Sequence, residues 1–472
     1  MAADGRRRAE LSSRRLASSN VQMVPLLLVA LLFTAVTAST ATAAAPAAAA
    51  PAAAPAAAAP AAVPPTAYPP SQLRRNASCV AAGLEPDLKP FRQVLPLPDI
   101  HGKGAGHEVF APLFASSSLS PTAAPDATVR QAVVFIHGAA GDANVYFCDG
   151  FAAAAKAAPG TLVIAPWFGK EQLTAAEWTG RAAAGPLGSA FYASTPAGGV
   201  GWLGGGDNAG PVPFTTSFDV LDAIVNTLGA ARAEGRFPSL ERVVVNGFSA
   251  GGQMVSRWAV FSPPSFVGGL PARVIAADGS SYMYLDATRP APSCSPLYDT
   301  GTNHSCGEFV IPVADGGANA CAGYDEYKYG LQVTAAAAES SMYLAEYAAS
   351  PTKLAAAVSA FLHTKDVRFI FGARDVCNCN IEGYTNRPDA CYHSNAHCTP
   401  NTHGGTVDGH SCCDTWPDTA TGNLCAHTCE AMLQGSNRLQ RGINYVSHLR
   451  KLSGSPEHPL MGFFNGGHNN SG

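Results

Sequence analysis

The amino-acid sequence predicts an α/β fold, in which a mostly parallel central sheet is covered by helices on both faces. Short apolar runs bounded by Gly, Pro or Asp recur along the chain, as expected for strands that are buried on both sides. Segments with apolar residues at helical spacing alternate with these runs, and such alternation is typical of parallel strands joined by helices. Hydrophobic residues make up 47% of the 472 positions, which is enough for a sizeable core.

The predicted elements follow one another over the body of the chain. Strands are expected at 132–136, 162–165, 242–245, 274–277, 367–371 and 460–464. Helices are expected after Thr216-Ser217 and over 353–362 and 437–452. Two stretches, 174–210 and 377–429, interrupt the alternation, and we interpret both as insertions over the strand ends, where substrate selectivity would reside.

The first 75 residues are expected to lie outside the folded body. Residues 1–40 combine basic residues, an apolar stretch over 24–36 and a tail of small residues, which is the pattern of a secretory signal peptide. A retained type II signal anchor, which would tether the protein to a membrane, is the alternative interpretation. Residues 41–75 are rich in Ala and Pro and predict a disordered linker, so the folded domain is expected over 76–472.

The cysteines indicate an oxidising compartment. Thirteen are present, and eight of them lie between Cys377 and Cys429. Their irregular spacing favours disulfides over zinc ligation, although the histidines interspersed among them leave a metal site as the alternative. Asn76 and Asn303 stand in Asn-x-Ser sequons, so both are predicted glycosylation sites. We therefore expect a secreted protein or one in the lumen of the secretory pathway.

The charge pattern excludes one class of partner. The formal net charge is only -4, and no run of Lys or Arg occurs beyond the N-terminal 40 residues. A surface that binds nucleic acid would need a basic patch or stripe. No nucleic-acid partner is therefore expected, and the sequence leaves the oligomeric state open.

The strongest chemical signal is the segment Gly247-Phe248-Ser249-Ala250-Gly251. It follows an apolar strand and precedes a run that is compatible with a helix, which is the context of a nucleophile on a sharp strand-to-helix turn. Glycines on both sides of Ser249 would relieve the Cβ clashes of such a turn, and the helix N-terminus would favour developing negative charge. The alternative is an ordinary surface turn.

A serine nucleophile needs donors for the oxyanion of the tetrahedral intermediate. The strand at 132–136 ends in His137-Gly138-Ala139, where small residues let the backbone aim an N–H group at a substrate oxygen. We assign the donors as the backbone N–H groups of Ala250 and Ala139. His137 itself is interpreted as an organiser of this loop, and an ordinary Gly-rich loop is the alternative.

The serine also needs a general base and an acid that orients it. Asp375 follows the strand at 367–371, and His468 follows the strand at 460–464, so both are expected at the same sheet edge as Ser249. The order Ser249, Asp375, His468 is that of α/β-hydrolases. A helix-capping role is the alternative for Asp375.

With these residues in view, the body resembles a group of secreted α/β-hydrolase-fold proteins common in fungi and some bacteria. Its further matching motifs are Ser217-Phe218-Asp219-Val220-Leu221-Asp222, Ser280-Ser281-Tyr282-Met283-Tyr284-Leu285, Tyr327-Lys328-Tyr329-Gly330-Leu331 and Gly435-Ser436-Asn437-Arg438. The resemblance implies the α/β-hydrolase fold, with Ser249, Asp375 and His468 in the triad positions. Phe248 departs from it, because such proteins often carry His there, and so does Asn469, where Asp is commoner.

Taken together, the residues predict a serine hydrolase without a cofactor or catalytic metal. Cleavage of a carboxylic ester, small or polymer-derived, through an acyl-enzyme is the leading expectation. A serine peptidase or amidase would use the same residues, because the fold does not choose between these substrates. A non-catalytic binding module on the same fold is the alternative from a different class.

Overall fold

The structure is a computed structural model. It describes residues 79–375 and 428–468, with gaps at 81–82, 85–87, 104–108, 170–171, 181–187, 191, 193–199, 210–214, 292–305, 313–320, 374, 436 and 465–467, and also describes 406–407 and 410–411. The expected signal segment, the linker, Asn76, Asn303 and most of the Cys-rich insertion lie outside the described residues. Within the described ranges, no helix has the length and apolar character needed to cross a membrane.

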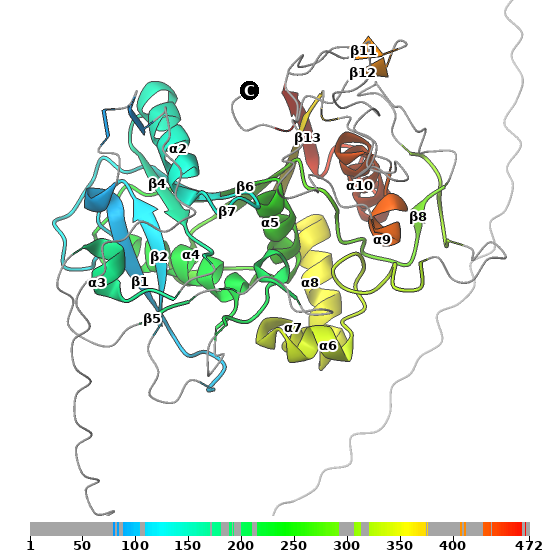
Figure 1. The fold of residues 1–472 in the computed structure, drawn as a ribbon, viewed down its shortest axis with the longest axis horizontal. Coiled ribbons are helices and arrows are strands. Elements are labelled where there is room, and N and C mark those ends of the chain that lie inside the picture. The colour runs from blue at the N-terminus through cyan, green and yellow to red at the C-terminus, as the bar shows by residue number, and fades with distance from the viewer. Residues whose placement is uncertain are drawn as a thin grey trace, which may run out of the picture. The chain divides into compact units, whose positions relative to one another are not determined.

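A nine-stranded sheet forms the centre of the folded body (Figure 1). Its strands are β1 (Arg92–Leu97), β2 (Val109–Ala115), β3 (Gln131–Ile136), β4 (Thr161–Pro166), β5 (Gly188–Ser189), β6 (Arg242–Phe248), β7 (Ala272–Ala277), β10 (Asp366–Gly372) and β13 (Leu460–Phe464). The order is β1-β2-β4-β3-β6-β7-β10-β13, and β5 pairs with β2. The pairs β1–β2 and β2–β4 are antiparallel, whereas every pair from β4 to β13 is parallel. This is an α/β-hydrolase fold, as predicted.

Nine helices join the strands in the part of the chain that the structure describes. They are α2 (Ala143–Ala157), α3 (Ala175–Thr179), α4 (Ser217–Ala233), α5 (Ala250–Phe261), α6 (Ala335–Glu339), α7 (Met342–Ala348), α8 (Pro351–His363), α9 (Cys429–Met432) and α10 (Arg438–Ser453). Several of these helices have a residue with a short polar side chain at the N-cap. The side-chain oxygen accepts a hydrogen bond from a backbone N–H group of the first turn. Thr216 caps α4 in a capping box with Asp219, and Asn437 caps α10 through the N–H of Gln440.

The smaller elements fill the connections. The 3-10 turns are η1 (Lys89–Phe91), η2 (Trp202–Gly204) and η3 (Val267–Gly269), and the two-residue strand pairs are β8 (Arg289–Pro290) with β9 (Phe309–Val310) and β11 (Thr406–Val407) with β12 (His410–Ser411). The stretch 174–210, predicted as an irregular insertion, contains α3, β5 and η2.

The sheet is buried on both faces, and β4 shows this in its alternating side chains. Leu162 and Ile164 belong to a large core that also contains residues of α4, α5, α8 and α10. Val163 and Ala165 belong to a second core formed with α2 and α3. The expectation of helices on both faces is confirmed. Parallel strands need such cover, because both of their faces are apolar.

Disulfides secure two peripheral segments. Cys79 is bonded to Cys148 of α2, and Cys321 is bonded to Cys429 at the start of α9, with Cα–Cα distances of 4.9 and 5.5 Å. Both distances lie in the usual range for a disulfide. The expectation of disulfides is therefore confirmed for these four cysteines.

Candidate active site

Ser249 occupies a strained turn between β6 and α5. Its backbone angles are φ 57° and ψ -116°, a conformation that residues other than glycine rarely adopt. A Cβ added at Gly251 would lie 2.3 Å from the carbonyl oxygen of Ile136, and one added at Gly247 would lie 2.2 Å from that of Gly251. The two glycines are thus required for close packing of the turn against β3 and against itself.

The structure brings the three residues expected for catalysis into one hydrogen-bonded chain. Ser249 Oγ lies 2.8 Å from Nε2 of His468, and Nδ1 of His468 lies 2.8 Å from Oδ2 of Asp375. The residues follow β6, β13 and β10, so they meet where the carboxyl ends of these parallel strands reach the same edge of the sheet. An imidazole held in this way can accept a proton from the serine hydroxyl.

Asp375 is fully buried and has a cationic partner that the sequence reasoning missed. Nη1 of Arg438, at the start of α10, lies 3.4 Å from Oδ1 of Asp375, and neither side chain is exposed. Burial acts to raise the pKa of Asp375, but the positive charge that His468 carries when protonated, the charge of Arg438 and the hydrogen bonds from both residues outweigh it, so the pKa is lowered. The carboxyl is therefore ionised at neutral pH.

The electrostatic surroundings keep His468 neutral. Burial lowers the pKa of its imidazole, the positive charge of Arg438 lowers it further, and Asp375 opposes both effects without cancelling them. A histidine with a lowered pKa is unprotonated at pH 7 and can act as a base. The ring of Phe248 lies beside it, with a centroid distance of 5.1 Å.

The loop after β3 lies next to the serine. A Cβ added at Gly138 would lie 3.8 Å from Cβ of Ser249, which places this backbone against the nucleophile. His137 is fully buried, and its Nε2 accepts from the N–H of Phe168 while its Nδ1 bonds the carbonyl of Gly138. His137 thus holds the loop, as expected. Ala250 is the first residue of α5, and Ala139 follows Gly138 at an exposed position.

An apolar groove opens beside these residues. It has a volume of about 310 Å³ and runs between α2 and the carboxyl halves of the central strands. Its lining residues are Phe135, Tyr146, Asp149, Gly150, Ala153, Asn246, Phe248, Ile275, Ala277, Ile370 and Phe464. Phe248 belongs both to the groove and to the contact with His468, so the groove lies next to the site.

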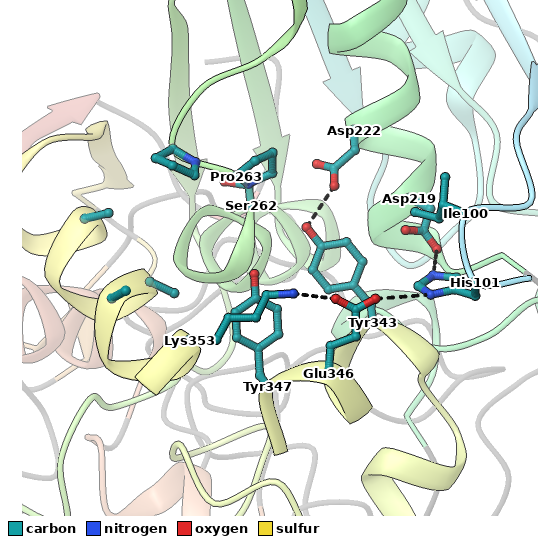
Figure 2. Close-up of a pocket in the computed structure, with 14 residues that line it drawn as sticks. Ile100, His101, Asp219, Asp222, Ser262, Pro263, Tyr343, Glu346, Tyr347 and Lys353 are labelled. Carbon is teal, nitrogen blue, oxygen red and sulfur yellow. Dashed lines mark hydrogen bonds and ion pairs between the residues drawn. The ribbon is translucent and has the colours of Figure 1, made fainter. Parts of the chain in front are cut away.

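A second cavity, of about 360 Å³, lies at the other end of α5, next to Ser262 (Figure 2). The length of the helix separates it from Ser249 by roughly 18 Å. Asp222 of α4 lines it and accepts hydrogen bonds from Nε1 of Trp258 and from the hydroxyl of Tyr343, each at 2.8 Å. Burial raises the pKa of Asp222 to about 7, against the effect of these two donors.

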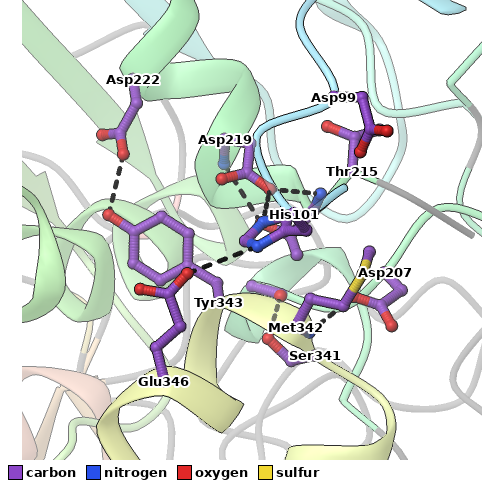
Figure 3. A network of polar contacts seen from close by, with 12 residues as sticks. Asp99, His101, Asp207, Thr215, Asp219, Asp222, Ser341, Met342, Tyr343 and Glu346 are labelled. Atoms are coloured by element: carbon purple, nitrogen blue, oxygen red, sulfur yellow. Dashed lines mark hydrogen bonds and ion pairs between the residues drawn. The ribbon is translucent and has the colours of Figure 1, made fainter. Parts of the chain in front are cut away.

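Beside Asp222, a histidine joins three elements (Figure 3). Nε2 of His101 lies 2.9 Å from Oδ2 of Asp219 in α4, and its Nδ1 lies 3.4 Å from Glu346 in α7. The hydrogen bond to Asp219 raises the pKa of His101, burial opposes it, and the charges of Asp219 and Glu346 add to the rise. This network connects the segment after β1 to the helices and takes no part in the chain from Ser249 to Asp375.

The fold and the geometry together define an α/β-hydrolase-fold protein with a serine, a histidine and an aspartate in hydrogen-bond contact. No protein-family model matches the chain, and neither does any curated protein. The expected membership of the secreted fungal and bacterial group therefore stays a prediction.

Among solved structures, the chain is similar to a poly(aspartic acid) hydrolase from Sphingomonas sp. KT-1, with 17% identity over 80% of this chain and 94% of that one, and a TM-score of 0.40. It is also similar to a poly(3-hydroxybutyrate) depolymerase from Bordetella parapertussis, with 15% identity over 80% and 85% of the chains and a TM-score of 0.39. An esterase from Pyrococcus furiosus shares 14% identity over 62% and 75%, with a TM-score of 0.27. These proteins are hydrolases. The strand order of this chain defines its α/β-hydrolase fold independently of them.

Proposed function

We propose that the chain is a serine hydrolase that cleaves a carboxylic ester through an acyl-enzyme. The observation that carries this proposal is the 2.8 Å contact between Ser249 Oγ and Nε2 of His468, an imidazole whose pKa is lowered by burial. A serine hydroxyl is a poor nucleophile until a base takes its proton, and here the base is in hydrogen-bond contact. Asp375 fixes the ring with its proton on Nδ1, which leaves the lone pair of Nε2 for the serine.

In the proposed reaction, Ser249 Oγ attacks the ester carbonyl carbon and its proton passes to Nε2 of His468. The backbone N–H groups of Ala250 and Ala139 donate to the resulting oxyanion. The tetrahedral intermediate collapses, the alcohol leaves with the proton from His468, and Ser249 retains the acyl group. His468 then deprotonates a water molecule that attacks the acyl carbon, and the bond from that carbon to Ser249 Oγ breaks. The acid leaves as His468 returns the proton to Oγ.

The groove beside Phe248 supports an apolar acyl or alkyl portion in the substrate. Most of its lining side chains are aromatic or aliphatic, and Asp149 is the only carboxylate among the lining residues. Ala153 of α2 lines it at an exposed position, so Ala153→Phe would narrow the groove while Ser249, His468 and Asp375 stay unchanged. We expect this variant to lose activity toward long-chain esters more than toward acetate esters.

Labelling with a fluorophosphonate probe tests the nucleophile. The wild type should be labelled, and both Ser249→Ala and His468→Gln should abolish labelling while circular dichroism shows intact folding. A folded wild type that resists the probe would reject the hydrolase proposal and favour the non-catalytic binding module. A panel of esters, amides and peptides then decides the bond that is cleaved, since the same residues serve a peptidase or amidase.

The disulfides support a location in an oxidising compartment. Cytosolic proteins rarely keep structural disulfides, whereas secreted ones often do. We propose that the protein is secreted or resides in the secretory pathway, with Asn76 and Asn303 as glycosylation sites. Expression in a eukaryotic secretion host, followed by glycosidase treatment of the wild type and of Asn303→Gln, tests this proposal by the change in mass.

A further inference from the structure

A second carboxylate, Asp278, lies at the edge of the sheet that holds Ser249. It directly follows β7, which is hydrogen-bonded between β6 and β10. Its neighbour Ala277 pairs with Phe248 and accepts from the N–H of Ser249 at 2.9 Å. Asp278 is thus level with the serine and next to the strand that leads to Asp375.

The position of Asp278 is closely determined. The residue is fully buried, and its φ of 45° is unusual for a residue other than glycine. Oδ1 accepts from the N–H of Gly372 at 2.9 Å, and the N–H of Asp278 donates to the carbonyl of Ile370 at 3.2 Å. These two bonds attach the end of β7 to the last residues of β10, three positions before Asp375.

The carboxyl of Asp278 lies close to the imidazole that Asp375 orients. An oxygen of Asp278, an oxygen of Asp375 and a ring nitrogen of His468 all lie within 4.8 Å of one another. The site therefore contains two buried carboxyls and one imidazole. Arg438 contacts Oδ1 of Asp375 and so favours Asp375 as the charged acceptor for the imidazole in the intact site.

We propose that Asp278 is a positioning residue for His468 and a reserve for Asp375, an inference that rests on the proposed function. In the intact site, Asp375 accepts from Nδ1 of His468, and the carboxylate of Asp278 adds negative potential near the ring. When Asp375 loses its charge, the carboxylate of Asp278 takes over the orientation of the imidazole. No bond is made or broken in this role, and the proton on Nδ1 stays where it is.

The test uses Asp278→Asn, Asp375→Asn and the double variant. Asparagine keeps an oxygen for the N–H of Gly372, so Asp278→Asn removes the charge and retains the structural bond. We expect kcat/KM to fall about 10-fold or less in Asp278→Asn and about 10²-fold in Asp375→Asn. Loss of a sole acid from such a site costs about 10⁴-fold, and we expect that loss only in the double variant.

A purely structural role for Asp278 gives a different pattern. In that case Asp278→Asn does not change kcat/KM in either background, and Asp375→Asn alone lowers kcat/KM by about 10⁴-fold. Equal fold-losses for Asp278→Asn in both backgrounds would likewise overturn the reserve role, because a reserve acts only when Asp375 is absent. Asp278→Glu in the Asp375→Asn background should restore part of the activity if the carboxylate is what matters.

A second readout separates this inference from the proposed activity. The proton on Nδ1 of His468 gives a low-field NMR resonance when it is bonded to a carboxylate, and His468→Gln identifies the signal. The resonance should persist in Asp375→Asn and disappear in the double variant. Its loss in Asp375→Asn alone would overturn the reserve role, whereas an inactive wild type that shows the expected resonances would overturn only the hydrolase proposal.

Discussion

The carboxyl of Asp222 gives a stability prediction whose magnitude can be worked from the structure. It lines the second cavity, and its two oxygens accept from Trp258 and Tyr343. Asn fits the same place, because its oxygen can accept from Trp258 while its amide donates to the hydroxyl oxygen of Tyr343. Asp222→Asn therefore removes the ionisable group with little change in packing.

The pH dependence follows from the raised pKa. Asp222 titrates near 3.8 in the unfolded chain and near 7 in the folded one, so between these values the folded state holds a proton that the unfolded state has lost. The contribution of Asp222 to stability is then full below the unfolded pKa and falls as the pH rises toward the folded pKa. From pH 5 to pH 8 the loss is about 2.5 kcal/mol for a fully desolvated carboxyl. Asp222 is only partly buried and lines a cavity, so solvent screening reduces the loss to about 1–2 kcal/mol.

Urea unfolding of the wild type and of Asp222→Asn at several pH values between 5 and 8 measures this loss. As the pH rises from 5 to 8, the free energy of unfolding of the variant should increase by about 1–2 kcal/mol relative to that of the wild type. Any packing cost of the substitution is the same at every pH and cancels in this difference. Asp366→Asn is a control that should run parallel to the wild type over this interval: burial acts to raise the pKa of Asp366, but hydrogen bonds from Arg368 and Arg273 lower it, so its contribution to stability is constant above pH 5. Parallel pH profiles for the wild type and Asp222→Asn would refute the reasoning.

Three further predictions concern the site and its surroundings. Arg438→Gln removes a charge that lowers the pKa of His468, so the acid limb of kcat/KM should move to higher pH, and an unmoved limb would exclude this influence. Gly251→Ala would place a Cβ 2.3 Å from a backbone oxygen of β3, so urea unfolding should show a loss of about 2–4 kcal/mol, together with weaker fluorophosphonate labelling. His101→Gln removes a cation held by Asp219; because the pKa of His101 is raised on folding, its stabilisation is full below pH 6.5 and declines as the pH rises through the folded value. At pH 6 the free energy of unfolding of His101→Gln should therefore be about 1 kcal/mol below that of the wild type, and the difference should shrink by pH 9.5. The same difference at both pH values would contradict the charge interaction.

The neighbouring positions of Ser249, Asp375 and His468 could be expected from sequence because each follows a strand that is readable in isolation. The runs 242–245, 367–371 and 460–464 correspond to β6, β10 and β13 within three residues at each end. Parallel strands in one sheet deliver the residues that follow them to the same edge. No knowledge of side-chain contacts was needed for that step.

The same rule could have identified Asp278, which follows the predicted strand 274–277 as Asp375 follows its own. Arg438 is different, because an arginine in the first turn of a helix ordinarily faces solvent. It is buried only because α10 packs across the end of β10, a tertiary relation that helical periodicity does not encode. Its signal in the sequence was limited to the motif shared with the resembling family.

The antiparallel strands β1 and β2 were also missed, for a local reason. Both contain a proline, Pro96 in β1 and Pro112 in β2, and a proline within an apolar run argues against a strand. In the structure, Val94 pairs with Pro112, and Pro96 pairs with Phe110. A proline is tolerated where its missing N–H faces away from a partner strand, which only the register reveals.

The charge on Arg438 has two consequences for the proposed mechanism that act in the same direction. Burial alone would raise the pKa of Asp375 and leave a neutral carboxyl, which could not hold the proton of His468 on Nδ1. The interactions with His468 and the guanidinium of Arg438 together keep Asp375 ionised. Burial and the positive charge of Arg438 lower the pKa of His468, so the imidazole starts the reaction without a proton on Nε2. Both conditions are needed for Ser249 to lose its proton. In the proposed mechanism, Arg438 therefore helps Ser249 to lose its proton through its effects on both Asp375 and His468.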